Sequence, residues 1–241
     1  MAENIHAVAL RAVKYNDKTT ILTVWTAEYG QIGLLMPAGR SRETMRRRAL
    51  TQPLSLFECV ADIRPGRELF HVSDLRPVTP FATIHTNGMK ASIAMFLAEA
   101  LTKTLRGGGD ILLWQFIARS LADFDAMSCR QAANFHLWFL THLASVLGFG
   151  PDYADFRSGM VFDLIAARFA TIPASADHCL AGDDARLARI FMACDPGRLA
   201  LIALNRHTRA RILDTILDYY ARHHQSLRPL KTLDILPHLA P

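Results

Sequence analysis

Five arginines lie within nine positions of this sequence, in the segment AGRSRETMRRRAL (38–50), and a single acid, Glu43, lies among them. The arginines are Arg40, Arg42, Arg46, Arg47 and Arg48. Guanidinium groups are planar donors that bind phosphate oxygens two at a time and stack on nucleic-acid bases. Because like charges repel and one acid offers little relief, the cluster is typical of a surface that holds an anion. The alternative interpretation is an ordinary solvated face.

The arginine segment lies in the longest connection between five short apolar runs that precede residue 80. These runs are rich in Val, Ile, Leu and aromatic residues and are separated by turn residues, which predicts strands over 5–15, 19–26, 31–37, 53–62 and 67–75. Five short strands in this length favour a small closed barrel, with the OB-fold as the leading candidate. The arginines would then occupy the helix or loop between the third and fourth strands.

The hydrophobic period changes after PVTPF (77–81), whose two prolines indicate a stiff hinge. Apolar residues then recur at the helical spacing, which predicts helices over 89–105, 111–124 and 130–148 and one or two helices over 196–224. We therefore expect an α+β protein with two domains: a five-stranded OB-fold nucleic-acid-binding barrel over residues 1–80 and an all-α helical domain over residues 81–241.

The composition excludes several classes of protein. The chain has 241 residues and a net charge of +5, a mild basic bias that suits a polyanionic partner. The longest stretch without charged residues, 131–151, contains His, Gln and Asn and predicts a buried core helix, not a membrane span. Four cysteines without a CxxC pair and the lack of a signal peptide indicate reduced thiols and a cytoplasmic protein.

Motifs for catalysis are missing from the sequence. RGGGD (106–110) lacks the Lys-Ser/Thr of a phosphate-binding loop, and neither GxGxxG, GxSxG nor HExxH occurs. We therefore expect no enzyme, no catalytic residues and no cofactor.

Aromatic side chains that could stack on bases accompany the arginines. Tyr15 and Tyr29 lie beside predicted turns, and their role is left open. Trp25 and Phe57 also lie on predicted strands, where we expect them to belong to the core. Tyr15 is therefore retained as a candidate DNA-binding residue.

The order of these features resembles the RecO family of bacterial recombination mediators. The opening AVALRAVKYNDKTTILTVWTAEYGQIGLLMPAGRSR resembles the family's first three strands, with Thr26 and Gly30 in its Thr-x-x-x-Gly turn and Arg40 and Arg42 in its basic run. LTQPLSLFECV and ELFHVSDLRPV continue the likeness. In the helical half, LGFGPDYADFRSGMVFDLIAARF (147–169) and LRPLKTLDIL (227–236) are similar to family segments. The resemblance covers nearly the whole chain.

The resemblance implies a protein that binds single- and double-stranded DNA without a sequence code and anneals complementary strands. It implies that the protein acts with RecR to load RecA onto DNA coated by single-strand-binding protein, whose C-terminal tail it contacts, in the cytoplasm at the nucleoid. Arg40 and Arg42 match the family's basic motif, Arg46, Arg47 and Arg48 follow by proximity, and Arg11 and Lys14 are further candidates on the first strand.

One departure from the family concerns zinc. Many members hold a zinc ion with two cysteine pairs after the long helix, but this sequence has no cysteine between 130 and 178. A tetrahedral site needs its thiolates at close spacing, so we expect no metal here. We expect aromatic packing to hold this segment instead, among Tyr153, Phe156, Phe162 and Phe169.

Two other functions remain open on the residues alone. The chain could be an interaction adaptor whose barrel binds an acidic peptide tail without contacting DNA directly. It could also be a nuclease or another nucleic-acid enzyme whose catalytic groups converge from distant positions.

Overall fold

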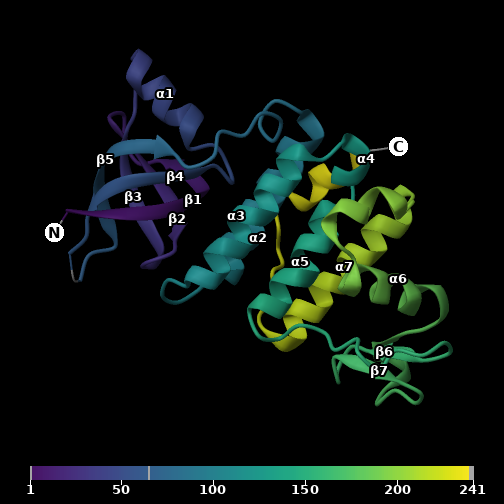
Figure 1. Ribbon diagram of the computed structural model, residues 1–241. Coiled ribbons are helices and arrows are strands. Elements are labelled where there is room, and N and C mark those ends of the chain that lie inside the picture. Colours follow the sequence, from purple (N-terminus) through teal and green to yellow (C-terminus); the bar gives the residue numbers. More distant parts are fainter. Residues whose placement is uncertain (1, 65, 239–241) are drawn as a thin grey trace. The chain divides into compact units, whose positions relative to one another are not determined.

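The computed structural model describes residues 2–64 and 66–238 (Figure 1). The chain begins with a closed barrel in the order β1-β2-β3-β5-β4, in which β3 and β5 pair in parallel and the other pairs are antiparallel. Its strands are β1 (Ala2–Lys14), β2 (Thr19–Thr26), β3 (Gly30–Pro37), β4 (Leu56–Asp62) and β5 (Leu69–Pro77). The predicted five-stranded barrel is confirmed, as is the α+β class.

Alternating side chains of the strands fill the barrel, as the period of two requires. Phe57, 0% exposed, lies inside the barrel, whereas Trp25, 2% exposed, alternates with the inward-facing Val24 and is buried on the outer face of β2. On β5 the alternation changes register at Asp74, which has a φ of 49°, so that Phe70 and Leu75 both face the core. The buried cluster includes Ile5, Leu22, Val24, Leu34, Phe57 and Phe70.

The connection between β3 and β4 is the helix α1 (Arg42–Leu50), which Figure 1 shows at one end of the barrel. It begins at Ser41, whose side chain accepts a hydrogen bond from the backbone N–H of Thr44 at 3.1 Å and so satisfies a free donor of the first turn. Thr44 is the buried residue of this helix, and Leu50 packs against the barrel core. The arginine segment is thus helical and folded onto the barrel.

The β2–β3 turn packs backbone to backbone against a glycine run that joins the helices α2 (Gly88–Thr104) and α3 (Ile111–Ala126). The Thr26 hydroxyl donates to the Gly30 carbonyl at 3.0 Å, and Gly30 has a φ of 70°. A Cβ on Gly30 would overlap Gly107, and a Cβ on Gly109 would overlap the Ala27 carbonyl. The glycine run therefore follows the end of α2 and permits a close contact with the β2–β3 turn.

Replacing Gly109 by alanine should lower the free energy of unfolding by about 2–3 kcal/mol, because the new methyl group has no room beside the turn. Gly108→Ala is the matched control, since nothing lies within 4 Å of a Cβ placed there. Urea denaturation of both variants checks the difference, and equal stability of the two would contradict the close packing.

The segment that leads into α2 is fixed by a carboxylate. Asp125 accepts hydrogen bonds from the backbone N–H groups of Ala82, Thr83 and Ile84 at 2.8, 2.7 and 2.9 Å. The ammonium group of Lys90, a residue 2% exposed, donates to the Thr83 hydroxyl at 2.7 Å and to the Asp125 carbonyl at 2.8 Å. The start of α2 and the end of α3 are therefore joined by half-buried polar contacts.

The described residues form two compact units. Unit one contains residues 2–126 and 230–236, and unit two contains residues 127–229 and 237–238. The helices α2 and α3 thus belong to the same compact unit as the barrel. The division into domains 1–80 and 81–241 stays a prediction.

Unit two is mainly helical and carries a small sheet in the order β7-β6-β8, which the sequence did not predict. The predicted helix 130–148 is two helices, because the chain leaves the helix at Ala133 and Asn134. The elements of unit two are α4 (Cys129–Ala132), α5 (Phe135–Val146), β6 (Val161–Asp163), β7 (Arg168–Ala170), η1 (Ala176–His178), β8 (Cys179–Leu180), α6 (Gly182–Ala193), η2 (Pro196–Leu201) and α7 (Arg206–His223). The short helix η3 (Leu233–His238) follows, and most of it belongs to unit one. Over the described ranges 2–64 and 66–238, no helix combines the length and apolarity needed to cross a membrane.

Aromatic side chains pack around the small sheet, as expected. The Phe169 ring lies edge-on to Phe162 and Phe156, with centroids 5.1 and 4.8 Å apart. Tyr153 instead lies under the Arg189 guanidinium, at 4.9 Å. Asp163, which is 1% exposed, accepts backbone N–H groups of Ile165, Ala166 and Ala174. A buried carboxylate and aromatic packing thus hold this segment.

Candidate nucleic-acid interface

The helix α1 presents its arginines to solvent on more than one face. Arg40, in the preceding loop, and Arg42, Arg46 and Arg48 of the helix are exposed. Arg42 and Arg46 are four residues apart and therefore share a face. Arg47 is the exception, because 28% of its side chain is exposed.

The single acid of the segment is bonded to two of its arginines. The Arg47 Nε donates to Glu43 Oε1 at 2.9 Å, and Arg46 Nη1 lies 3.5 Å from Glu43 Oε2. The hydrogen bond from Arg47, and to a lesser degree the charge of Arg46, lower the pKa of the Glu43 carboxyl. No described acid forms a salt bridge with Arg40, Arg42 or Arg48. These three charges are available to an anion.

The turn between β1 and β2 lies beside the start of the arginine segment. The Ala38 backbone N–H donates to the Lys18 carbonyl at 2.8 Å, and Thr19 pairs with Pro37 in the sheet. The turn carries Tyr15, which is 65% exposed, so its ring is open to stack on a base.

The end of β1 adds the two remaining candidates to this side of the barrel. Arg11 and Lys14 are exposed and pair only with β2, because the pairing of β1 with β4 ends at Val8. A bulge after Ala9 shifts the register of this part. Lys14 Nζ lies 2.6 Å from an Asp17 carboxylate, so its charge is partly compensated. Sequence reasoning omitted Lys18, which only the contact with Ala38 reveals.

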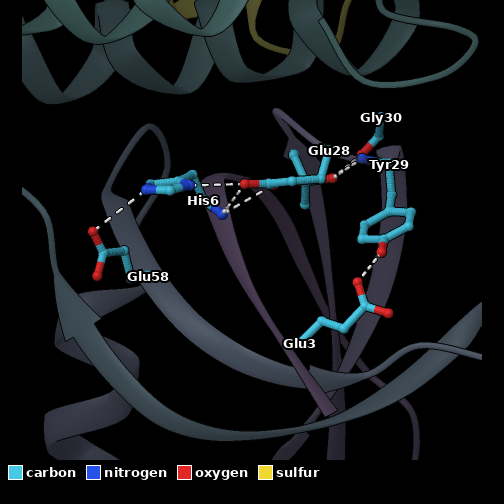
Figure 2. A network of polar contacts seen from close by, with 7 residues as sticks. Glu3, His6, Glu28, Tyr29, Gly30 and Glu58 are labelled. Atoms are coloured by element: carbon cyan, nitrogen blue, oxygen red, sulfur yellow. Dashed lines mark hydrogen bonds and ion pairs between the residues drawn. The ribbon is translucent and has the colours of Figure 1, made fainter. Parts of the chain in front are cut away.

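The opposite end of the barrel is acidic. Figure 2 shows His6 between two carboxylates, with its Nδ1 2.7 Å from Glu28 Oε1 and its Nε2 3.5 Å from Glu58 Oε1. The Tyr29 hydroxyl donates to Glu3, and this contact with the carboxylate is the largest cause of the raised pKa of Tyr29. Tyr29 therefore lies away from the arginines, with its hydroxyl held by an acid.

Sequence reasoning also missed a groove across β2, β3 and the start of β5. Its charges are mixed, because Arg64 is bonded to Asp62 and Glu68 lies on the same wall as Arg67. The available cations therefore lie mainly at the α1 end of the barrel and not in this groove.

The cysteines are dispersed over the structure. Cys59 is buried in the barrel, Cys129 is exposed, and Cys179 and Cys194 are half-buried. In the part of the chain that the structure describes, no three His, Cys, Asp or Glu side chains lie close enough to hold a metal ion. The expectation of a protein without zinc stays a prediction.

A closed five-stranded barrel with a helix between its third and fourth strands defines this chain as an OB-fold protein. The family model described as "Recombination protein O N terminal" matches residues 1–81, and "Recombination protein O C terminal" matches residues 85–234. The chain belongs to this family, RecO.

Similar proteins are known from several bacteria. The chain is 32% identical to "DNA repair protein RecO" of Phocaeicola vulgatus over 240 residues, which covers 99% of each chain. It is also 32% identical to the protein of that name from Bacteroides fragilis over 242 residues, with 99% of each chain covered. The Porphyromonas gingivalis protein of that name is 29% identical over 236 residues, covering 95% of this chain and 96% of its own.

Proposed function

We propose that the protein is a DNA-binding recombination mediator in DNA repair. It binds single- and double-stranded DNA at the α1 end of the barrel and anneals complementary strands. The observation that carries the proposal is the set of exposed guanidinium groups of Arg40, Arg42 and Arg48, which form no ion pair within the described residues, on an OB-fold barrel of a RecO family member.

The contacts proposed for this surface have distinct roles. Arg40, Arg42, Arg46 and Arg48 bind phosphate oxygens, while Arg47 supports Glu43 and contributes less charge to the DNA. Arg11 and Lys14 extend the surface along β1, and Tyr15 stacks on a base. Contacts to the phosphate backbone of DNA carry no sequence information, so binding is independent of the DNA sequence.

The proposed partners follow from the family. The protein acts with RecR to load RecA onto DNA covered by single-strand-binding protein, whose C-terminal tail it contacts. It works in the cytoplasm at the nucleoid, hydrolyses no nucleotide and cuts no strand. Incubation of labelled DNA with the protein and Mg²⁺ tests the last point, because a mediator leaves the strands intact and a nuclease does not.

Affinity for single-stranded DNA should fall steeply with salt, because each neutralised phosphate releases counterions. For about five contacts, raising the salt concentration from about 50 to 200 mM should weaken binding roughly a hundredfold. Fluorescence anisotropy with two oligonucleotides of unrelated sequence measures this, and both should respond alike. No binding at the lower salt would refute the proposal.

A second candidate function is an adaptor that binds an acidic peptide tail without DNA. It is favoured by an apolar pocket in unit two, with Phe191, Ile212 and Ile216 in its wall. Such a pocket suits the apolar groups of a peptide, while its Arg211 guanidinium is already bonded to the Asp184 carboxylate at 2.8 Å. A gel shift with oligonucleotide alone separates the two functions, since an adaptor shifts nothing until its partner is added.

A further inference from the structure

A second group of exposed arginines lies in unit two. Arg130 belongs to α4, Arg198 to η2, and Arg206 is the first residue of α7. All three side chains are exposed. The ion pairs found among the described residues of unit two involve other arginines, namely Arg186, Arg211 and Arg228. We call Arg130, Arg198 and Arg206 the α4–α7 surface.

Contacts between α4 and η2 bring the first two arginines to one region. The Gln131 Nε2 donates to the Gly197 carbonyl at 3.2 Å. Arg130 immediately precedes Gln131, and Arg198 immediately follows Gly197. The backbones that carry the two arginines are therefore no more than about one side chain apart.

Asn134 joins the start of α7 to the same region. Its Nδ2 donates to the Ile202 carbonyl at 2.8 Å, and its Oδ1 accepts from Arg209 Nε at 3.2 Å. Arg209 Nη2 donates to the Leu204 carbonyl at 2.9 Å. Arg209 thus holds the segment before α7 against the end of α4, and Arg206 follows that segment as the first residue of α7.

Electrostatics within unit two do not explain these charges. Arg206 and Arg209 lie in the first turn of α7, which holds no acid, although a helix N-terminus disfavours cations. The nearby Asp195 carboxylate accepts the Gly197 N–H at 2.8 Å and forms no ion pair with Arg198 within the described residues. No ion pair among the described residues neutralises these three arginines, which leaves their charges available to an external anion.

We propose that the α4–α7 surface binds the sugar–phosphate backbone of a second nucleic-acid strand while the arginines at the α1 end of the barrel bind the first. The inference rests on the proposed function and adds the site of the second strand. Two polyanions must approach each other before they can anneal, and two separate cationic surfaces neutralise both. Exposed guanidinium groups without an apolar pocket suit the binding of phosphates, and phosphate contacts do not depend on the nucleotide sequence.

The test uses the full chain with Arg130, Arg198 and Arg206 all replaced by glutamate. The control carries Arg157→Glu, Arg168→Glu and Arg186→Glu, which are exposed residues of the same unit and change the net charge equally. Three measurements are compared: anisotropy of one labelled single strand, capture of a second non-complementary strand by protein already bound to the first, and the annealing rate of two complementary strands followed by energy transfer.

We expect the variant of the α4–α7 surface to bind one single strand with an affinity within about twofold of the unsubstituted protein. Its capture of a second strand and its annealing rate should each fall about tenfold or more. The control variant should behave like the unsubstituted protein in all three measurements. Unchanged annealing overturns the inference, as does an equal loss in the control. Loss of binding to an acidic protein partner with annealing intact also overturns it, because the surface would then serve a protein. If the unsubstituted protein fails to bind even one strand, the proposed function itself fails, which is a separate outcome.

Discussion

Replacing Arg40, Arg42 and Arg46 together by glutamate should lower the affinity for single-stranded DNA about a hundredfold at 0.1 M salt. At that salt concentration, each phosphate contact to a single strand raises the logarithm of the binding constant by about 0.7. Losing three contacts should also make the slope of log affinity against log salt shallower by about two. Arg48 is left unchanged because an acid in the last turn of α1 would oppose the helix dipole. Arg47 is left unchanged because only 28% of its side chain is exposed and its Nε donates a hydrogen bond to Glu43 at 2.9 Å.

The control for this prediction is a variant of the same unit with Arg106, Arg119 and Lys231 changed to glutamate. All three residues are exposed, and the net charge changes by the same amount. Anisotropy over a salt series, with oligonucleotides of different sequence, measures both variants. If the two variants lose affinity equally, long-range charge and not the α1 end of the barrel carries the binding.

Replacing Asp163 by alanine should lower the free energy of unfolding by about 3–5 kcal/mol, because three N–H groups lose a charged acceptor. The hydrogen bonds from Ile165, Ala166 and Ala174 measure 2.8, 2.9 and 2.6 Å. Asp163→Asn retains one acceptor oxygen and should cost less. Asp155→Ala, an exposed carboxylate of the same segment, is the control. Urea denaturation at pH 7 measures the free energy of unfolding of the three variants. A loss below about 1 kcal/mol in Asp163→Ala would contradict the role of this buried carboxylate.

The same carboxylate predicts a pH dependence. The N–H of Ala166, followed by that of Ala174, lowers the pKa of Asp163. The stabilisation of the folded protein by ionised Asp163 is therefore complete above the ordinary aspartate pKa of about 3.9. It is lost as the pH falls through the lower pKa that Asp163 has in the folded protein. The difference between the unsubstituted protein and Asp163→Asn should narrow below about pH 4, since the asparagine does not titrate. A constant difference between pH 7 and pH 3 would count against this assignment.

Much of the barrel can be predicted from the sequence, because turn residues and β-branched runs define its strands locally. The change of face at Asp74 could not be predicted, since the positive φ depends on its tertiary surroundings. The short strands of the small sheet escape detection because two or three residues show no period. The break in the predicted helix 130–148 depends on Asn134, whose partners Ile202 and Arg209 are far away in sequence.

The candidate site was predictable where its residues are consecutive. The arginines of α1 form one segment, but the position of Lys18 beside Ala38 depends on strand pairing. Arg47 is less exposed than the other arginines of the segment, and this difference depends on how α1 packs on the barrel. The α4–α7 surface has no sequence signature, because Arg130 is 68 positions from Arg198 and the fold alone brings them together. A search of the sequence for clustered charges therefore finds the arginines of α1, which lie on one helix, but misses a surface whose arginines come from three elements.

The end of β1 has a consequence for the behaviour of the protein in solution. Among the described strands, only β2 pairs with β1 from Arg11 to Lys14, which leaves one row of peptide groups that a strand from another molecule could pair with. Val13 in this row is 43% exposed, which would favour such an association. Charged residues on an edge strand oppose edge-to-edge pairing. We therefore expect Arg11 and Lys14 to oppose aggregation of the barrel, so that neutralising them to weaken DNA binding should also make the protein more prone to aggregate.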